Sequence, residues 1–182
     1  MLSRIGWLIF GFLSLLLLVY LFVPSTTFPK PLPDSPQSKE PGDVLDLNVK
    51  RAYFTDNDRE RVTSFYRNQF QIPALQFIKP IRLNYPPEEA EWHIYPHTRS
   101  SYLEEYVFPL RESIFVNGYQ PGPKDDQIVF EGQPYQSKVT VKYNRAGVLE
   151  RLGIGLMVIV SCGAMILAIG NQLNRLIKRI RS

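Results

Sequence analysis

Two histidines are the residues with the clearest potential for metal or acid–base chemistry. His93 and His97 stand four positions apart, and on a helix this spacing would place both on one face as metal ligands. Pro96 lies between them, and the alternating apolar residues of this stretch favour extended structure, in which the two positions are about 13 Å apart. The carboxylates that could complete an oxygen-rich site are Glu88, Glu89 and Glu91. A membrane-tethered hydrolase or metal-binding domain is therefore one hypothesis, and a solvated proline-rich loop is the competing interpretation.

A second group of residues could supply paired carboxylates for acid–base catalysis. It consists of Glu104, Glu105 and Glu112. These acids also have a non-catalytic explanation. They can cap a short helix that begins at Ser101, or lie on solvent-exposed faces. The sequence has no Gly-x-Ser-x-Gly motif, phosphate-binding loop or dinucleotide fingerprint, and its one cysteine, Cys162, lies in an apolar segment. We therefore expect no enzymatic activity, no cofactor and no resident metal.

Tyrosines form the third candidate group, between residues 95 and 119. Tyrosine combines a large apolar area with a polar tip, so it is frequent in binding surfaces, and it is equally common in α+β cores. The pattern fits a core better, with an interaction surface as the alternative. The tyrosines assigned to this candidate surface are Tyr95, Tyr102, Tyr106 and Tyr119.

Two long apolar segments frame the chain. Residues 5–23 carry no charge and would span about 28 Å as a helix, close to the thickness of a bilayer core. Trp7 and Tyr20 lie near its two ends, where amphipathic rings favour the membrane interface. Residues 152–170 form a second, glycine-rich apolar segment. We predict two transmembrane helices; a cleaved signal peptide is the alternative for the first.

The distribution of charge predicts the orientation in the membrane. The net charge is +4, all 17 acidic residues lie between Asp34 and Glu150, and the basic excess flanks the apolar segments rather than forming a nucleic-acid surface. The tail, residues 171–182, is basic through Arg175, Lys178, Arg179 and Arg181. By the positive-inside rule the stub 1–4 and this tail are cytoplasmic, and residues 24–150 lie outside the cytoplasm. We expect the tail to continue the second helix, with a helix lying on anionic lipid as the alternative.

The segment between the two predicted helices divides into a linker and one domain. Six prolines between Pro24 and Pro41 predict an extended linker over 24–43. Residues 44–145 contain a clear amphipathic helix at 57–70, capped by Asp56, among several short strand patterns. The prediction is an α+β domain in which an antiparallel sheet carries one or two helices, with a ferredoxin-like topology as the first guess. The domain has no cysteine, which favours a bacterial or archaeal plasma membrane.

These observations favour a non-enzymatic structural or interaction subunit of a cell-envelope complex. Its expected partners are the lipid bilayer and a protein, or a second copy of the chain, contacted through the outer domain or the transmembrane helices. Nucleic acid is not an expected partner. A small-ligand binding module outside the cytoplasm is the further alternative, beside the hydrolase that would use His93 and His97.

Overall fold

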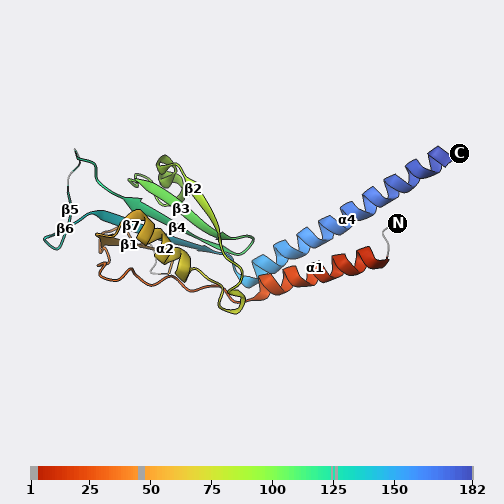
Figure 1. Ribbon diagram of the computed structural model, residues 1–182, viewed down its shortest axis with the longest axis horizontal. Helices are drawn as coiled ribbons and strands as arrows, with labels where there is room; N and C mark the ends of the chain where they lie inside the picture. The colour runs from red at the N-terminus through yellow and green to blue at the C-terminus, as the bar shows by residue number, and fades with distance from the viewer. Residues whose placement is uncertain (1–3, 45–47, 124, 126, 182) are drawn as a thin grey trace. The chain divides into compact units, whose positions relative to one another are not determined.

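The computed structural model describes residues 4–44, 48–123, 125 and 127–181, and it consists of two compact units (Figure 1). One unit is helical and combines the two ends of the chain, residues 1–24 and 146–182. The other is the domain Ser25–Arg145. Alternating apolar residues predict a first strand near residues 47–54, and its Leu47 lies outside the described residues.

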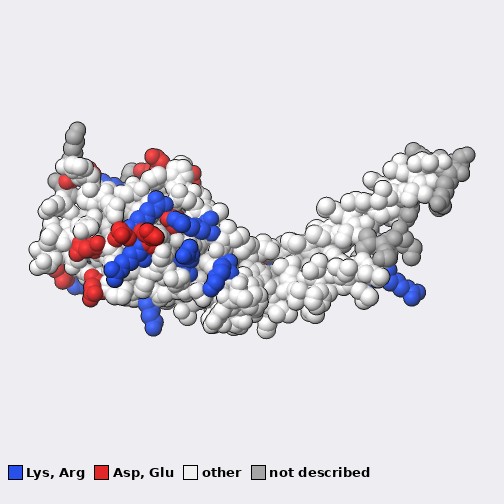
Figure 2. Space-filling view, viewed as in Figure 1, with Lys and Arg blue, Asp and Glu red and all other residues white. Residues whose placement is uncertain are grey.

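The helical unit contains the two predicted apolar segments. The first forms α1 (Arg4–Phe22), which ends one residue before the predicted segment 5–23 does, and the second falls within α4 (Val148–Arg181). Each helix is long and apolar enough to cross a membrane. Helix α4 begins before the predicted segment 152–170 and continues through the basic tail without a break. Apart from their ends, both helices are white in Figure 2, which shows that charged side chains are nearly absent from their visible surface.

Small residues of α4 face large side chains of α1. A Cβ atom at Gly155 would meet the buried Leu21 side chain, and one at Gly163 would lie 3.7 Å from the Phe10 ring. The Arg151 Nη1 donates a hydrogen bond of 3.4 Å to the carbonyl oxygen of Val23, just beyond the end of α1. The last carbonyls of a helix have no partner within it, so this bond satisfies one of them.

The domain is built on one antiparallel sheet, which confirms the predicted α+β class. The sheet order is β1-β7-β4-β3-β2. These strands are β1 (Lys50–Thr55), β2 (Ile81–Tyr85), β3 (Tyr102–Phe108), β4 (Glu112–Tyr119) and β7 (Ser137–Arg145). Every neighbouring pair is antiparallel. The order differs from the ferredoxin-like guess, because three strands rather than one separate β1 from β2, the strands on either side of the main helix.

Helix α2 (Arg59–Gln69) matches the amphipathic pattern and packs its Val62 and Tyr66 side chains into the core. Asp58 caps it, because its carboxylate accepts a 2.8 Å hydrogen bond from the Arg61 amide. The predicted cap, Asp56, instead accepts a 2.9 Å bond from the Gln136 amide at the start of β7. The cap is therefore two residues later than the sequence pattern suggested.

In two short stretches the secondary structure is the opposite of the one that the sequence predicted. The stretch expected to form a helix from Ser101 is strand β3, whose side chains are mostly buried against both faces of the sheet. The stretch around Trp92 expected to be extended is helical: η2 (Pro87–Glu89) leads directly into α3 (Ala90–His93). Proline is well suited to the first position of a helical turn, so Pro87 starts this element.

The two faces of the sheet carry separate cores. Helix α2 covers one face, where Tyr66 and Phe70 lie among the buried side chains. The opposite face packs against α3 through the cluster Ala90, Ile94, Leu103 and Phe115. Antiparallel partners share a face, so Asn117, Thr140 and Ala52, which stand side by side on β4, β7 and β1, all belong to the α3 face.

The proline-rich segment lies along the domain rather than standing away from it. Residues 36–38 cover the outer edge of β1: the Ser38 amide donates to the Ala52 carbonyl at 2.8 Å, and the Phe54 amide donates to the Pro36 carbonyl at 3.0 Å. Near its start, the Thr26 amide donates to the Glu112 carboxylate at 3.2 Å. These bonds make residues 25–43 part of the folded unit.

The remaining elements are small. A 3-10 turn, η1 (Pro73–Leu75), connects α2 to β2. Strands β5 (Ile128–Phe130) and β6 (Gln133–Tyr135) form a separate hairpin, whose tight turn places Glu131 and Gly132 at positive φ. Glycine adopts that conformation without steric cost.

Candidate functional site

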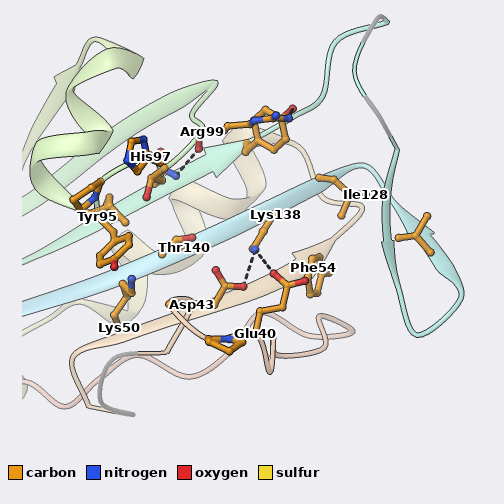
Figure 3. Close-up of a pocket in the computed structure, with 18 residues that line it drawn as sticks. Glu40, Asp43, Lys50, Phe54, Tyr95, His97, Arg99, Ile128, Lys138 and Thr140 are labelled. Carbon is orange, nitrogen blue, oxygen red and sulfur yellow. Dashed lines mark hydrogen bonds and ion pairs between the residues drawn. The ribbon is translucent and has the colours of Figure 1, made fainter.

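A cavity of about 520 Å³ lies on the α3 face of the sheet (Figure 3). Strands β1, β7 and β4 supply its floor, and its rim comes from residues 94–99 after α3, residues 40–43 and strand β5. This volume is in the range of sites that bind small molecules. The floor side chains are Lys50, Phe54, Asn117, Tyr119, Lys138 and Thr140.

Asn117 provides an unsatisfied acceptor in this floor. Its side chain is 1% exposed, and its Nδ2 donates a 3.3 Å hydrogen bond to the Arg99 carbonyl on the rim. Its Oδ1 is buried and has no hydrogen-bond partner among the described residues. Native proteins rarely leave a buried polar atom in this state, since doing so costs about 1–3 kcal/mol. A ligand that donates a hydrogen bond here would remove that cost.

Lys50 contributes a buried positive charge to the same cavity. The residue is 2% exposed, and its Nζ lies 4.6 Å from the centre of the Tyr95 ring. Burial lowers the pKa of the Lys50 ammonium, and the negative charge of Asp43 opposes this shift. The described residues give its Nζ no hydrogen-bond acceptor. The ammonium group is thus partly desolvated, and it lies in the lining where a ligand can supply an acceptor.

A second lysine in the floor is paired within the protein. The Lys138 Nζ lies 2.6 Å from the Asp43 Oδ2 and 3.2 Å from the Glu40 Oε2 (Figure 3). The Ser38 hydroxyl also donates to Asp43. Asp43 is therefore already engaged by two donors, which limits how far it can neutralise Lys50.

Arg99 adds a third positive charge, at the rim. Its Nη1 donates a 3.2 Å hydrogen bond to the Tyr119 hydroxyl. The described lining thus contains the cations Lys50, Lys138 and Arg99 and the carboxylates Glu40 and Asp43. The cavity has an excess of one positive charge with its histidine neutral.

The structure does not bring the two histidines into one site. His97 is exposed at the cavity rim, with φ at 65°. His93, on α3, packs instead against the Phe115 ring at 4.9 Å, and its Nε2 lies 3.3 Å from the Glu89 Oε2. Among the described residues no group of three or more His, Cys, Asp or Glu side chains is placed to hold a metal ion. The two histidines therefore do not form the shared site that the metal and hydrolase hypotheses assumed.

The four candidate tyrosines separate into two pairs. Tyr95 and Tyr119 line the cavity. Tyr102 and Tyr106 are buried on the opposite face of the sheet, where burial raises the pKa of Tyr106 to about 12. Only the first pair is placed to contact a ligand in this cavity.

The three candidate catalytic carboxylates serve other contacts. Glu104 and Glu105 point to opposite faces of β3, so they cannot act as a pair. Glu105 accepts a 2.7 Å bond from the Tyr85 hydroxyl. Glu112 is buried and accepts bonds from the Tyr143 hydroxyl at 2.8 Å and the Arg111 Nη2 at 3.0 Å.

The predicted membrane-interface residues are described only in part. Trp7 is exposed on α1, Tyr20 is half-buried, and Arg175 is exposed on α4. The side chains of Lys178, Arg179 and Arg181 lie outside the described residues.

Sequence reasoning missed Lys50 and Asn117, the two residues that define the cavity. The pair Asn117-Gly118 resembles a turn signal, but both residues lie within β4. For Asn117 the available signal was a polar residue next to the apolar run of β4, whereas Lys50 stands at the start of β1 beside Arg51 and gives no such signal. Comparisons with protein families, with curated proteins and with solved structures find no match to this chain.

Proposed function

We propose that this chain is a membrane-anchored, non-enzymatic binding protein that holds a small polar ligand in the cavity of its outer domain. In this proposal α1 and α4 cross the plasma membrane of a bacterial or archaeal cell, with both chain ends in the cytoplasm. The domain Ser25–Arg145 then lies outside the cytoplasm, where it meets its ligand.

The observation that carries the proposal is the buried Oδ1 of Asn117, which has no partner in the described residues, in a cavity lining that also contains the ammonium group of Lys50. Binding sites combine apolar walls with a few polar groups that fix the orientation of the ligand. The rings of Tyr95, Tyr119 and Phe54 supply the apolar part of the lining here.

A melting-temperature screen tests this proposal on the full chain in phosphatidylcholine nanodiscs. The probes are a set of amino acids, sugars and organic acids, each at millimolar concentration. We expect at least one compound to raise the melting temperature of the wild type but not of Asn117→Leu, because only the native state binds it. Asn144→Leu changes an exposed asparagine and is the matched control. Hits that bind Asn117→Leu as well as the wild type would contradict the proposal, as would a screen without hits.

A separate surface favours the second candidate, an interaction subunit of a cell-envelope complex. Large apolar side chains are exposed near the β2 edge of the sheet: Trp92 is 86% and Phe77 is 79% exposed, and Ile81 is half exposed. Such exposure is typical of protein contacts. Cross-linking of the full chain in native membranes, followed by mass spectrometry, tests this candidate. A stoichiometric partner should be lost in Trp92→Glu but retained in Lys79→Glu.

A further inference from the structure

We infer that the ligand of the cavity is a hydroxylated organic anion, a carboxylate carried on a small polyol such as a sugar acid. The inference rests on the proposed binding function and adds the chemical class of the ligand. Two groups of the cavity lining carry it: the Oδ1 of Asn117, which is buried without a partner among the described residues, and the Nζ of Lys50, whose neighbour there is the Tyr95 ring.

Lys50 calls for a negative charge rather than a neutral acceptor. A desolvated charge is costly unless it is paired and hydrogen-bonded. The Tyr95 ring and the charge of Asp43 provide attraction, but the Asp43 carboxylate is bound to Lys138 at 2.6 Å and to the Ser38 hydroxyl. A carboxylate on the ligand would supply both the charge and the acceptor oxygens that this ammonium group lacks.

Asn117 calls for a hydrogen-bond donor. The orientation of its amide is fixed, since reversal would place the Oδ1 against the Arg99 carbonyl oxygen, which now accepts from Nδ2 at 3.3 Å. The atom left without a partner is therefore an acceptor, and a carboxylate would be repelled there. A hydroxyl or N–H group on the ligand is the complementary partner.

The two groups lie too far apart for one small anion. Lys50 stands two residues along β1 from Ala52, and Ala52 and Asn117 are separated by one strand, β7. With strands spaced by about 4.8 Å and residues by about 3.4 Å, the two Cα atoms are roughly 12 Å apart. The Lys50 side chain is directed to Tyr95 on the rim (Figure 3). A ligand that meets both groups must carry its charge and its donors on a frame of several atoms.

Three probe compounds test the need for a carboxylate and the need for hydroxyl groups separately. Each is added to the full chain in phosphatidylcholine nanodiscs at constant ionic strength. Sodium D-glucuronate carries a carboxylate and hydroxyl groups, D-glucose carries the hydroxyl groups alone, and sodium acetate carries the carboxylate alone. Isothermal titration calorimetry measures each dissociation constant. We expect glucuronate to bind at least 10-fold more tightly than glucose or acetate.

Variants assign the two recognition groups. Lys50→Met should weaken glucuronate binding about 10–100-fold, the usual range for a lost hydrogen bond to a charged group. Lys50→Arg keeps the charge and should retain more of the affinity. Asn117→Leu should also weaken binding by about 10-fold. Lys79→Met and Asn144→Leu change exposed residues of the same types and should bind as the wild type does. Circular dichroism checks that each variant is folded.

The remaining outcomes of these titrations would overturn part or all of the inference. Glucose bound as tightly as glucuronate would overturn the need for an anion, and acetate bound as tightly would overturn the need for hydroxyl groups. If none of the three binds while other compounds from the screen bind the wild type and not Asn117→Leu, the ligand class is wrong and the proposed function stands. If no compound binds this cavity, both are wrong.

Discussion

The buried carboxylate of Glu104 provides the sharpest test of how this domain is held together. Glu104 is 0% exposed and accepts bonds from the Arg59 Nε and Nη2 at 3.0 and 2.9 Å, the Arg82 Nε and Nη2 at 2.8 and 2.6 Å, and the Tyr106 hydroxyl at 2.7 Å. Burial acts to raise the pKa of Glu104, but the hydrogen bonds from Arg82, Tyr106 and Arg59 outweigh it, and the pKa lies below its ordinary value. The group is therefore ionised at neutral pH.

The substitution Glu104→Gln keeps the shape of the side chain and removes its charge and one acceptor oxygen. If the amide oxygen takes the place of Oε1, the amide nitrogen faces the Arg82 Nε and the Tyr106 hydroxyl, which both lose their acceptor. Each hydrogen bond to a charged group contributes about 1.5–3 kcal/mol. The Arg59 and Arg82 side chains are 42% and 50% exposed, so water recovers part of the loss. We expect a loss of about 2–4 kcal/mol in the free energy of unfolding.

Thermal unfolding of the full chain in nanodiscs, followed by circular dichroism, measures this loss. For a unit of this size it corresponds to a decrease of roughly 8–15 °C in melting temperature. The neighbouring substitution Glu105→Gln is the matched control. Glu105 is half-buried on the other face of the sheet and accepts a hydrogen bond from the Tyr85 hydroxyl. Glu105→Gln should therefore lower the free energy of unfolding by less than about 1 kcal/mol.

The pH dependence of stability distinguishes the contribution of the Glu104 charge from that of its side-chain packing. The folded-state pKa of Glu104 is lowered, so its stabilisation is fully present above the ordinary value of 4.5 and is lost as the pH falls through the folded-state value. The difference in stability between wild type and Glu104→Gln should be constant at pH 6–8 and should narrow in acid. A difference below about 2 °C at pH 7, or one that persists unchanged in acid, would refute this reasoning.

Three further predictions concern other parts of the chain. Gly118→Ala should destabilise the domain by about 1–3 kcal/mol in thermal unfolding, because its Cβ would overlap the Tyr102 ring. Lys50→Met should raise the melting temperature of the ligand-free protein at pH 7. The pKa of Lys50 is lowered by burial, so wild-type stability should increase as the pH rises from that lowered value towards 10.5, and the variant should lack this increase. Gly155→Leu should weaken the pairing of α1 and α4 by about 1–3 kcal/mol in an SDS titration, because Leu21 occupies the space beside it.

Each of these three has a matched control. Gly147→Ala places a Cβ at an ordinary 3.7 Å from the Glu150 side chain, Lys79→Met removes an exposed charge, and Gly170→Leu enters space with no atom within 4 Å of a new Cβ. Equal effects of test and control variants would contradict the packing argument for each glycine. A Lys50→Met protein that is less stable than the wild type at pH 7 would contradict the argument from desolvation.

The elements that could be predicted from the sequence are those whose signal is local. The apolar stripe of α2 fixes a helix by its spacing, and the two apolar segments give helices by length and composition. The prediction was wrong at Ser101 because Glu104 was interpreted as a helix-capping residue. Its partners Arg59 and Arg82 lie 45 and 22 residues away, and no local pattern shows that they converge on it.

The candidate site could not be predicted for the same reason. Its floor combines residues of β1, β4 and β7, and strands that are neighbours in the sheet are far apart in the chain. Asn117-Gly118 resembled a turn, whereas Gly118 lies within β4 where the Tyr102 ring leaves no space for a side chain. The histidine spacing was a local signal, but α3 ends at His93, so the two rings diverge.

The charged groups on the two faces of the sheet are paired differently, although buried hydroxyls without a partner among the described residues also occur on the α2 face, at Tyr53 and Tyr66. On the α2 face the fold gives the buried carboxylates Glu104 and Glu112 several donors each. On the α3 face the Asn117 Oδ1 is buried without a partner in the described part of the chain, and the Lys50 Nζ has the Tyr95 ring and the charge of Asp43 near it but no ion pair there. A ligand that supplies these partners stabilises the native state by about 1.4 kcal/mol for each tenfold excess over its dissociation constant. Lys50→Met should therefore increase the stability of the ligand-free domain and abolish most of the additional stability that glucuronate provides, which a purely structural lysine would not do.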